Sequence, residues 1–260
     1  MKIVPNESEY AKRCLKQGYV EKNNPYMSVL RVVRYLNRCG IEDIDELFDE
    51  TSKYLESVRD VGKKCEEFQL TEEMIVKMLK KDMVYNELES VSISSNEIKA
   101  IMNNKYPHSW RKVLFVMLVQ CKAKNIVCNS THMRINSDLT EILKDAHVNM
   151  SVDKRCEVLG QLERDGYIEI SNGGSDTKFI YLKYIDEEPQ DELIVVRDFF
   201  DMYLYFDCYV KGGRLMKCKE CEKLVHVTKS HDYSTKYCDD CKKKKALEKQ
   251  KRYDDKKRKK

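Results

Sequence analysis

Apolar positions recur at helical spacing through the first 108 residues and predict a helical domain over residues 1–108. Asn24-Pro25 begins one helix, because proline is tolerated at the first helical position, and Gly40 is suited to its C-terminal end. Polar residues ahead of apolar runs predict further helix starts at Asp43 or Asp45, at Thr71 and at Ser95.

Residues 109–188 predict a second domain in which short strands accompany helices. Residues 110–124 are apolar on all sides, which is typical of a buried helix. After it we expect, in order, a strand over 133–136, helices capped by Ser137 and by Ser151, and a hairpin of strands 167–171 and 177–185 around Asn172-Gly173-Gly174. In the helix that Ser151 caps, the predicted inward residues are Val152, Cys156, Leu159 and Leu162.

Residues 189–216 predict a connecting strand, beginning at Leu193, and a short aromatic helix. Its aromatic residues are more often packing residues than a base-stacking platform, and they are Phe199, Phe200, Tyr203, Tyr205 and Phe206. Gly212-Gly213 then indicates a hinge into the last module.

Residues 217–241 contain two cysteine pairs at the spacing of a tetrahedral zinc site: Cys218 and Cys221, then Cys238 and Cys241. Two residues between cysteines let a tight turn aim both sulfurs at one ion, and the 16-residue gap has room for a hairpin that returns the second pair. The alternative is four reduced thiols. A four-cysteine shell leaves no open position, so we predict one structural Zn²⁺.

The zinc module resembles a treble clef, or a zinc ribbon with a helical extension, because helix formers follow Cys241. In such knuckles glycine is expected after the second cysteine. Glu222 stands there instead, and we therefore expect a looser turn. His226 and His231 could each replace a cysteine ligand, but with four thiolates present they are expected on the surface or in the hairpin.

Charge is concentrated at the end of the chain. Residues 242–260 hold 12 Lys or Arg against three acids, a net of +9, and since the whole chain carries +4, the other 241 residues carry −5. Such a tail predicts binding of DNA or RNA through phosphate neutralisation; the alternatives are solubility or an acidic protein surface. The predicted contacts are Lys242, Lys243, Lys244, Lys245, Lys249, Lys251, Arg252, Lys256, Lys257 and Arg258.

The element order over residues 109–188, with the segment LERDGYIEI and TKFIYL, resembles a winged helix-turn-helix. The resemblance implies that the third helix enters the DNA major groove. Its outward cations, Lys154 and Arg155, are the candidates, although Asp153, Glu157 and Asp165 make this surface mixed. Protein–protein contact is the other use that the resemblance implies. The predicted fold class is mainly α with small β sheets.

Nothing in the sequence predicts an enzyme: a phosphate loop, a zinc-protease helix and a nucleophile elbow are all missing. No run of 18 apolar residues suggests a membrane span, and 11 cysteines without an export signal indicate a reducing, cytoplasmic location. Several of the seven cysteines outside the zinc set fall on apolar faces, where a buried cysteine acts as a small apolar residue.

The segments NNPYMSVLRVVRYL, WRKVLFVMLV and KYCDDCKKKKALEKQKRYDDKKRKK together resemble zinc-ribbon proteins of phages and mobile elements in low-GC Gram-positive bacteria. That resemblance implies a role in DNA transactions, regulation or host takeover, in the host cytoplasm. One hypothesis is a DNA-binding transcription regulator or replication accessory protein whose helical domain dimerises or contacts a partner. The other is a factor that inhibits or recruits a host polymerase or defence nuclease.

Overall fold

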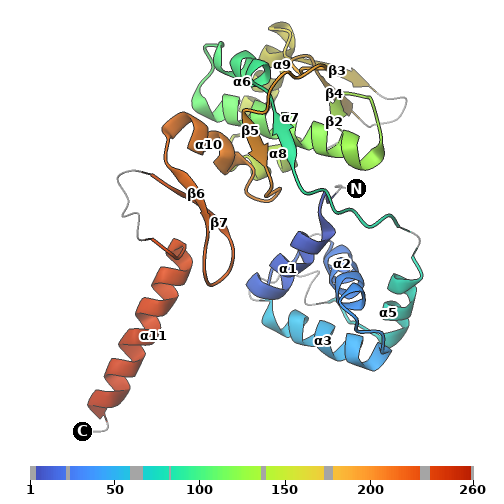
Figure 1. Cartoon of the computed structure of the whole chain (residues 1–260), viewed down its shortest axis with the longest axis vertical. Helices are drawn as coiled ribbons and strands as arrows, with labels where there is room; N and C mark the ends of the chain where they lie inside the picture. The colour runs from blue at the N-terminus through green and yellow to red at the C-terminus, as the bar shows by residue number, and fades with distance from the viewer. Residues whose placement is uncertain are drawn as a thin grey trace. The chain divides into compact units, whose positions relative to one another are not determined.

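The computed structural model describes residues 4–21, 24–58, 67–81, 83–135, 139–172, 178–228 and 235–258, with the side chains of 172, 178 and 252–258 left out (Figure 1). The chain divides into two compact units. The sheet unit comprises Met1–Pro5, Leu88–Met216 and Leu224–Thr235. The helical unit comprises Asn6–Glu87, Lys217–Lys223 and Lys236–Lys260.

The helical unit is built on α1 (Glu7–Gln17), α2 (Pro25–Arg38), α3 (Ile44–Ser57) and α5 (Glu72–Leu79). Short polar side chains satisfy the first backbone N–H groups of three of these helices, since Asn6, Asp43 and Thr71 each accept a bond from the residue three positions on. The core between the helices is apolar and includes Leu30, Val33, Leu47, Ile75 and Met78. The predicted starts at Pro25, Asp43 and Thr71 are confirmed.

The sheet unit surrounds α7 (His108–Cys128), whose residues from Val113 to Val119 are all fully buried. The elements α6 (Ser95–Met102), α8 (Leu139–Asp145) and α9 (Val152–Arg164) belong to the same unit. An antiparallel sheet of order β2-β4-β3 completes it, from β2 (Arg134–Ile135), β3 (Ile168–Asn172) and β4 (Lys178–Leu182). The predicted sequence of helix, strand, two helices and hairpin is therefore observed.

Two further contacts within the sheet unit connect residues distant in sequence. Strand β1 (Val91–Ile93) pairs with β5 (Ile194–Val196), and α10 (Tyr203–Lys211) packs on α7. Phe206 of α10 is fully buried, and its ring lies 5.4 Å from the ring of Phe115 and 5.4 Å from that of His108. The predicted packing role is confirmed for this aromatic residue.

Some local predictions are confirmed and others need correction. The predicted helix start at Ser95 is confirmed, and Ser94 caps it, because its hydroxyl accepts from the Glu97 N–H while the Glu97 carboxylate accepts from the Ser94 N–H. In α9 the predicted inward residues Val152 and Cys156 are exposed, Val152 by 68%, whereas Val158 and Leu162 are buried. Ser137 and the turn residues Gly173 and Gly174 lie outside the described residues.

The last elements are the strands β6 (Arg214–Lys217) and β7 (Leu224–Val227), which pair as a hairpin, and the helix α11 (Asp239–Arg258). The fold class is thus mainly α with small sheets, as predicted. The hairpin differs in place from the prediction: it encloses the first cysteine pair instead of spanning the gap between the two pairs.

Candidate metal centre

Four cysteine sulfurs come together where the β6–β7 turn meets the start of α11. Cys218 and Cys221 lie in that turn, Cys238 directly precedes α11, and Cys241 lies in its first turn. All four Sγ atoms lie within 4.8 Å of one another, and those of Cys221 and Cys238 are 3.7 Å apart. Zn–S bonds of about 2.3 Å in a tetrahedron place sulfurs about 3.8 Å apart. The residues present therefore fit a single metal ion.

The first pair is aimed by a closed hairpin turn. The Glu222 N–H donates to the Cys218 carbonyl at 2.9 Å, and the Cys218 N–H donates to the Lys223 carbonyl at 2.9 Å. Glu222 takes a left-handed φ of 57°, the conformation for which glycine is expected here. The expectation of a looser turn is wrong, because Glu222 adopts the glycine conformation at a cost of about 1–2 kcal/mol.

Backbone N–H groups also point at the sulfurs. The Cys238 N–H donates to the Cys218 Sγ at 3.2 Å, and the Cys241 N–H donates to the Cys238 Sγ at 3.5 Å. Burial opposes the Cys218 thiolate, but backbone N–H donors outweigh it and lower the pKa of Cys218 to about 6. Burial raises the pKa of Cys241, as does its crowding by the other sulfurs. A bound cation would favour the thiolate form of all four.

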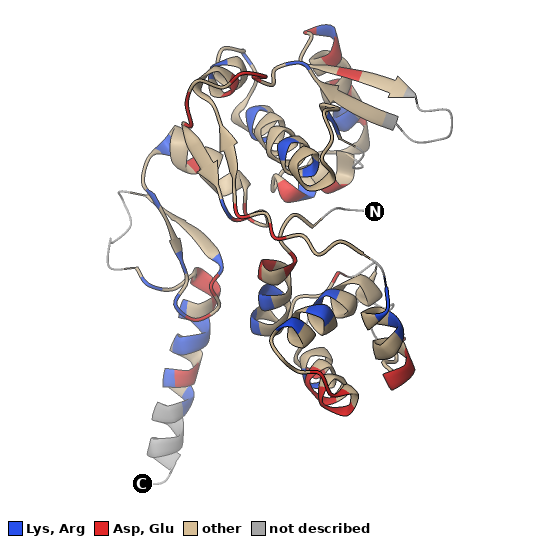
Figure 2. Ribbon diagram, turned by 45° about the vertical axis from the view of Figure 1, so that its right-hand side comes forward, with Lys and Arg blue, Asp and Glu red and all other residues tan. Residues whose placement is uncertain are grey.

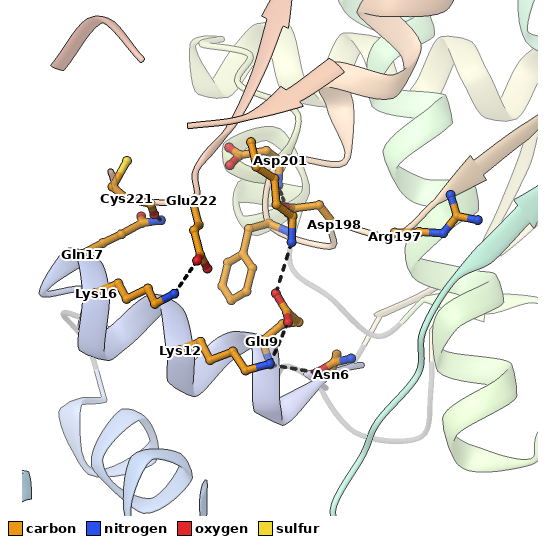
Figure 3. Close-up of polar contacts among 12 residues, drawn as sticks. Asn6, Glu9, Lys12, Lys16, Gln17, Arg197, Asp198, Asp201, Cys221 and Glu222 are labelled. Carbon is orange, nitrogen blue, oxygen red and sulfur yellow. Dashed lines mark hydrogen bonds and ion pairs between the residues drawn. The ribbon is translucent and has the colours of Figure 1, made fainter. Parts of the chain in front are cut away.

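Helix α1 contacts the turn that carries the first pair (Figure 3). The Gln17 side chain donates to the Cys221 carbonyl at 2.8 Å, and Lys16 forms an ion pair with Glu222. Lys217, just before the first ligand, lies 3.6 Å from the Glu9 carboxylate. These contacts join residues about 200 positions apart in sequence, and sequence analysis missed them.

The donor set favours zinc. Four thiolates are soft ligands, and four-cysteine sites of this geometry are typical of Zn²⁺. His226 does not join the cluster: it lies on β7, and its ring nitrogen Nε2 is 2.7 Å from the Gly212 carbonyl oxygen. His231 lies outside the described residues. The four predicted ligands are thus brought together, and the hairpin position expected for His226 is confirmed.

Comparison with protein-family models, with curated proteins and with solved structures finds no match to this chain. The case for a function therefore comes from the chain's own residues.

The helix α11 carries the predicted basic residues directly after the cluster (Figure 2). Lys242 lies 3.5 Å from Asp239, and Lys245 lies 2.8 Å from Glu220 with its ammonium 4.6 Å from the Tyr237 ring centre. Four others have no ion pair or hydrogen bond within the described part of the chain, and these are Lys243, Lys244, Lys249 and Lys251. The side chains of Arg252, Lys256, Lys257 and Arg258 are outside that description.

The two candidate cations of α9 have partners nearby. The Lys154 ammonium lies 2.8 Å from Glu157 and 5.5 Å from the Trp110 ring centre. Arg155 donates to the Met150 carbonyl at 3.1 Å and to the Thr140 hydroxyl at 3.0 Å. Both side chains therefore already have protein partners, although Arg155 keeps further N–H donors beyond these two bonds.

Outside the cluster, the described cysteines differ in environment. Cys14 and Cys121 are buried, and burial raises the pKa of each thiol to about 12. Cys39, Cys128 and Cys156 are exposed, Cys208 is half-buried, and Cys65 lies outside the described residues. Among the helices described, none combines the length and apolar character needed to cross a membrane.

Proposed function

We propose that this protein binds nucleic acid through α11 and that a structural zinc ion fixes the start of that helix. The observation that supports the proposal is continuity: Cys238 and Cys241 bracket the first residues of a 20-residue helix, and cations follow the second ligand without a break. Zinc would hold the helix at one end, and the remaining turns would be available to a ligand.

The cations of α11 are not evenly distributed around the helix. Because 3.6 residues make one turn, five basic positions follow one another along one side. We call them the basic stripe: Lys242, Lys245, Lys249, Arg252 and Lys256. The acids of the helix fall outside this stripe, and they are Asp239, Asp240, Glu248, Asp254 and Asp255. The stripe itself is made of cations alone, of which Lys242 and Lys245 form ion pairs with Asp239 and Glu220.

The length of the basic stripe suits a nucleic-acid backbone. The fourteen steps from Lys242 to Lys256, at about 1.5 Å each, extend it over about 21 Å. A stripe of this length can reach several phosphates of a nucleic-acid backbone. Contacts of this kind do not depend on the base sequence. Lys154 and Arg155, the candidates for sequence-specific contact, already have protein partners.

Two finer assignments belong to the same proposal. The element order of the sheet unit supports a winged-helix domain, and a cysteine-bearing hairpin turn followed by a cysteine-bearing helix start supports a treble clef. Both are common in nucleic-acid-binding proteins. A regulator or a replication accessory factor is the role we infer, with the zinc ion structural and not catalytic.

The test is fluorescence anisotropy with labelled duplex DNA over a salt series. In one full-length variant the five residues of the basic stripe are changed to Gln. In a matched variant five cations off the stripe are changed, namely Lys243, Lys244, Lys251, Lys257 and Arg258. The stripe variant should bind more weakly, with a salt slope shallower by about 0.9 for each phosphate that is no longer neutralised. The matched variant should keep most of the wild-type slope.

Equal weakening in the two variants would show that net charge, and not the stripe, gives the affinity. Wild-type protein that fails to bind DNA or RNA at low salt would overturn the proposed function. The sequence-based alternative, a factor that contacts a host protein machine, would then become the leading hypothesis.

A further inference from the structure

A second group of cations lies in the sheet unit, on the outer face of the antiparallel sheet. Ile135 and Ile180 point into the core and are almost fully buried, so their neighbours Arg134, Phe179 and Tyr181 belong to the other face. The Arg134 guanidinium lies over the Phe179 ring, 4.4 Å from its centre. Arg134 is also directly opposite Tyr181 in the strand register.

Lys124, on α7, brings a second cation to Arg134. Its ammonium donates to the Arg134 backbone carbonyl at 3.1 Å, which anchors the side chain beside the edge strand β2. Desolvation lowers the pKa of Lys124, and the neighbouring Arg134 charge lowers it further. Two like charges are therefore held close together, an arrangement that a bound anion would stabilise.

The hydrogen bonding of Arg134 is also incomplete. Its Nε–H group is buried and has no acceptor among the described residues. A buried donor without an acceptor is destabilising, because it has given up its bond to water. Arg134 as a whole is only half-buried, and its planar guanidinium can give a phosphate two bonds.

A carboxylate on the same face is already engaged. Glu169 lies opposite Tyr181 on the far side of β4 from Arg134, and it forms a 2.5 Å ion pair with Lys183. Lys183 and Glu169 thus balance each other, whereas Arg134 forms no ion pair with any carboxylate that the structure describes. The guanidinium of Arg134 therefore keeps its charge for a ligand.

We infer that Arg134 and Lys124 form a phosphate-binding site for nucleic acid on the outer face of the sheet, beside Phe179 and Tyr181. The site rests on the proposed function and extends it, because it places a second contact in the sheet unit, outside both α11 and α9. Arg134 binds the phosphate with its guanidinium, and Lys124 adds the second positive charge. The Phe179 ring, over which the guanidinium lies, holds it in place.

The test uses the full-length chain and three single substitutions. Lys124→Gln removes the charge and keeps an amide that can donate to the Arg134 carbonyl, so it preserves the fold. Arg134→Gln removes the guanidinium. Lys183→Gln is the matched control, since it removes a cation from the same face that already has its own carboxylate. Thermal melts establish that each variant is folded.

Binding of labelled duplex DNA is then measured by anisotropy across a salt series. Lys124→Gln and Arg134→Gln should each weaken binding on the order of threefold and reduce the salt slope by about 0.9, with Lys183→Gln unchanged. Wild-type affinity and slope in both site variants would overturn the site and leave the proposed function intact, because the basic stripe would still account for binding.

A second measurement separates failure of the site from failure of the proposed function. Inorganic phosphate is titrated into ¹⁵N-labelled protein, and the Arg134 Nε–H resonance is followed by NMR. The resonance should shift in the wild type and in Lys183→Gln, but much less in Lys124→Gln. If the wild type binds neither DNA nor RNA and this resonance does not move, both the site and the proposed function are overturned.

Discussion

Removing the metal ion tests the candidate centre most directly. The perturbation is a strong chelator, or Cys238→Ser, which deletes one of the four ligands. Cys156→Ser is the matched control, because Cys156 is exposed and lies outside the cluster. We expect the wild type to contain one zinc ion per chain, the control to retain it, and Cys238→Ser to lose it.

The structure indicates how large the effect should be. Binding of a structural zinc ion supplies on the order of 10 kcal/mol to a small module. The protein contacts that would remain are weak by comparison: the half-exposed Lys16–Glu222 ion pair contributes at most about 1 kcal/mol, and the Gln17 bond to Cys221 about 1 kcal/mol. Without metal the cysteine module should therefore unfold.

Unfolding of the module should extend into α11. A helix with many like charges at i, i+3 and i+4 is marginal in water unless one end is fixed. α11 has 20 of the chain's 260 residues, so about 8% of the chain should lose helical structure. Circular dichroism measures this decrease, and limited proteolysis after Lys or Arg should cut α11 first. Metal-free protein with unchanged helicity and an uncut α11 would refute the reasoning.

Three other substitutions test the packing around the two sites. The first substitution, Glu222→Gly, is made in a Lys16→Gln background, in which the ion pair is already absent. It should stabilise the zinc-loaded protein by about 1 kcal/mol in urea unfolding, because glycine adopts the left-handed φ without strain. Destabilisation would contradict the strain at Glu222. Phe206→Ala should cost the sheet unit about 3–5 kcal/mol in the same assay, and a decrease below 1 kcal/mol would show that its ring stacking matters little. Ser94→Ala should cost about 1 kcal/mol through removal of the cap, whereas Ser95→Ala, at the next position, should cost less.

Features set by neighbours in sequence were predictable. Asp43, Thr71 and Ser151 cap helices as expected, because a cap needs only its own side chain and the N–H groups two or three residues ahead. The cysteine cluster was predictable for a related reason. Two residues between the cysteines of a pair fix a turn, and the four ligands that a tetrahedral zinc ion requires predict that the two pairs meet.

The orientation of α9 could not be predicted from its sequence pattern. The helix contains two apolar pairs at i, i+4 spacing, Val152 with Cys156 and Val158 with Leu162, and at 3.6 residues per turn their centres lie about 120° apart around the helix. Periodicity permits either pair to face inward. Packing against the rest of the sheet unit selects the second pair, and that choice depends on residues far away in sequence.

The contacts of α1 with the cysteine turn could not be predicted from the sequence either, because they also join residues far apart along the chain. Lys16, Gln17 and Glu222 are ordinary surface residues when read along the chain. Only the folded chain shows that Glu222 both takes the glycine conformation and meets Lys16. Glu222, whose presence in place of glycine suggested a looser turn, thus joins the cysteine turn to α1.

Local partners, more than counts of charge, distinguish the basic surfaces of this protein. Lys154 and Arg155 of α9 already have partners, a carboxylate for Lys154 and a backbone carbonyl for Arg155. Lys249, on the basic stripe, and Arg134, on the outer sheet face, have no carboxylate partner among the described residues. Binding phosphate breaks no ion pair at Lys249 or Arg134, whereas at Lys154, and at Lys242 and Lys245 of the basic stripe, it must first break one. Nucleic acid should therefore engage Lys249 and Arg134 before it engages Lys154.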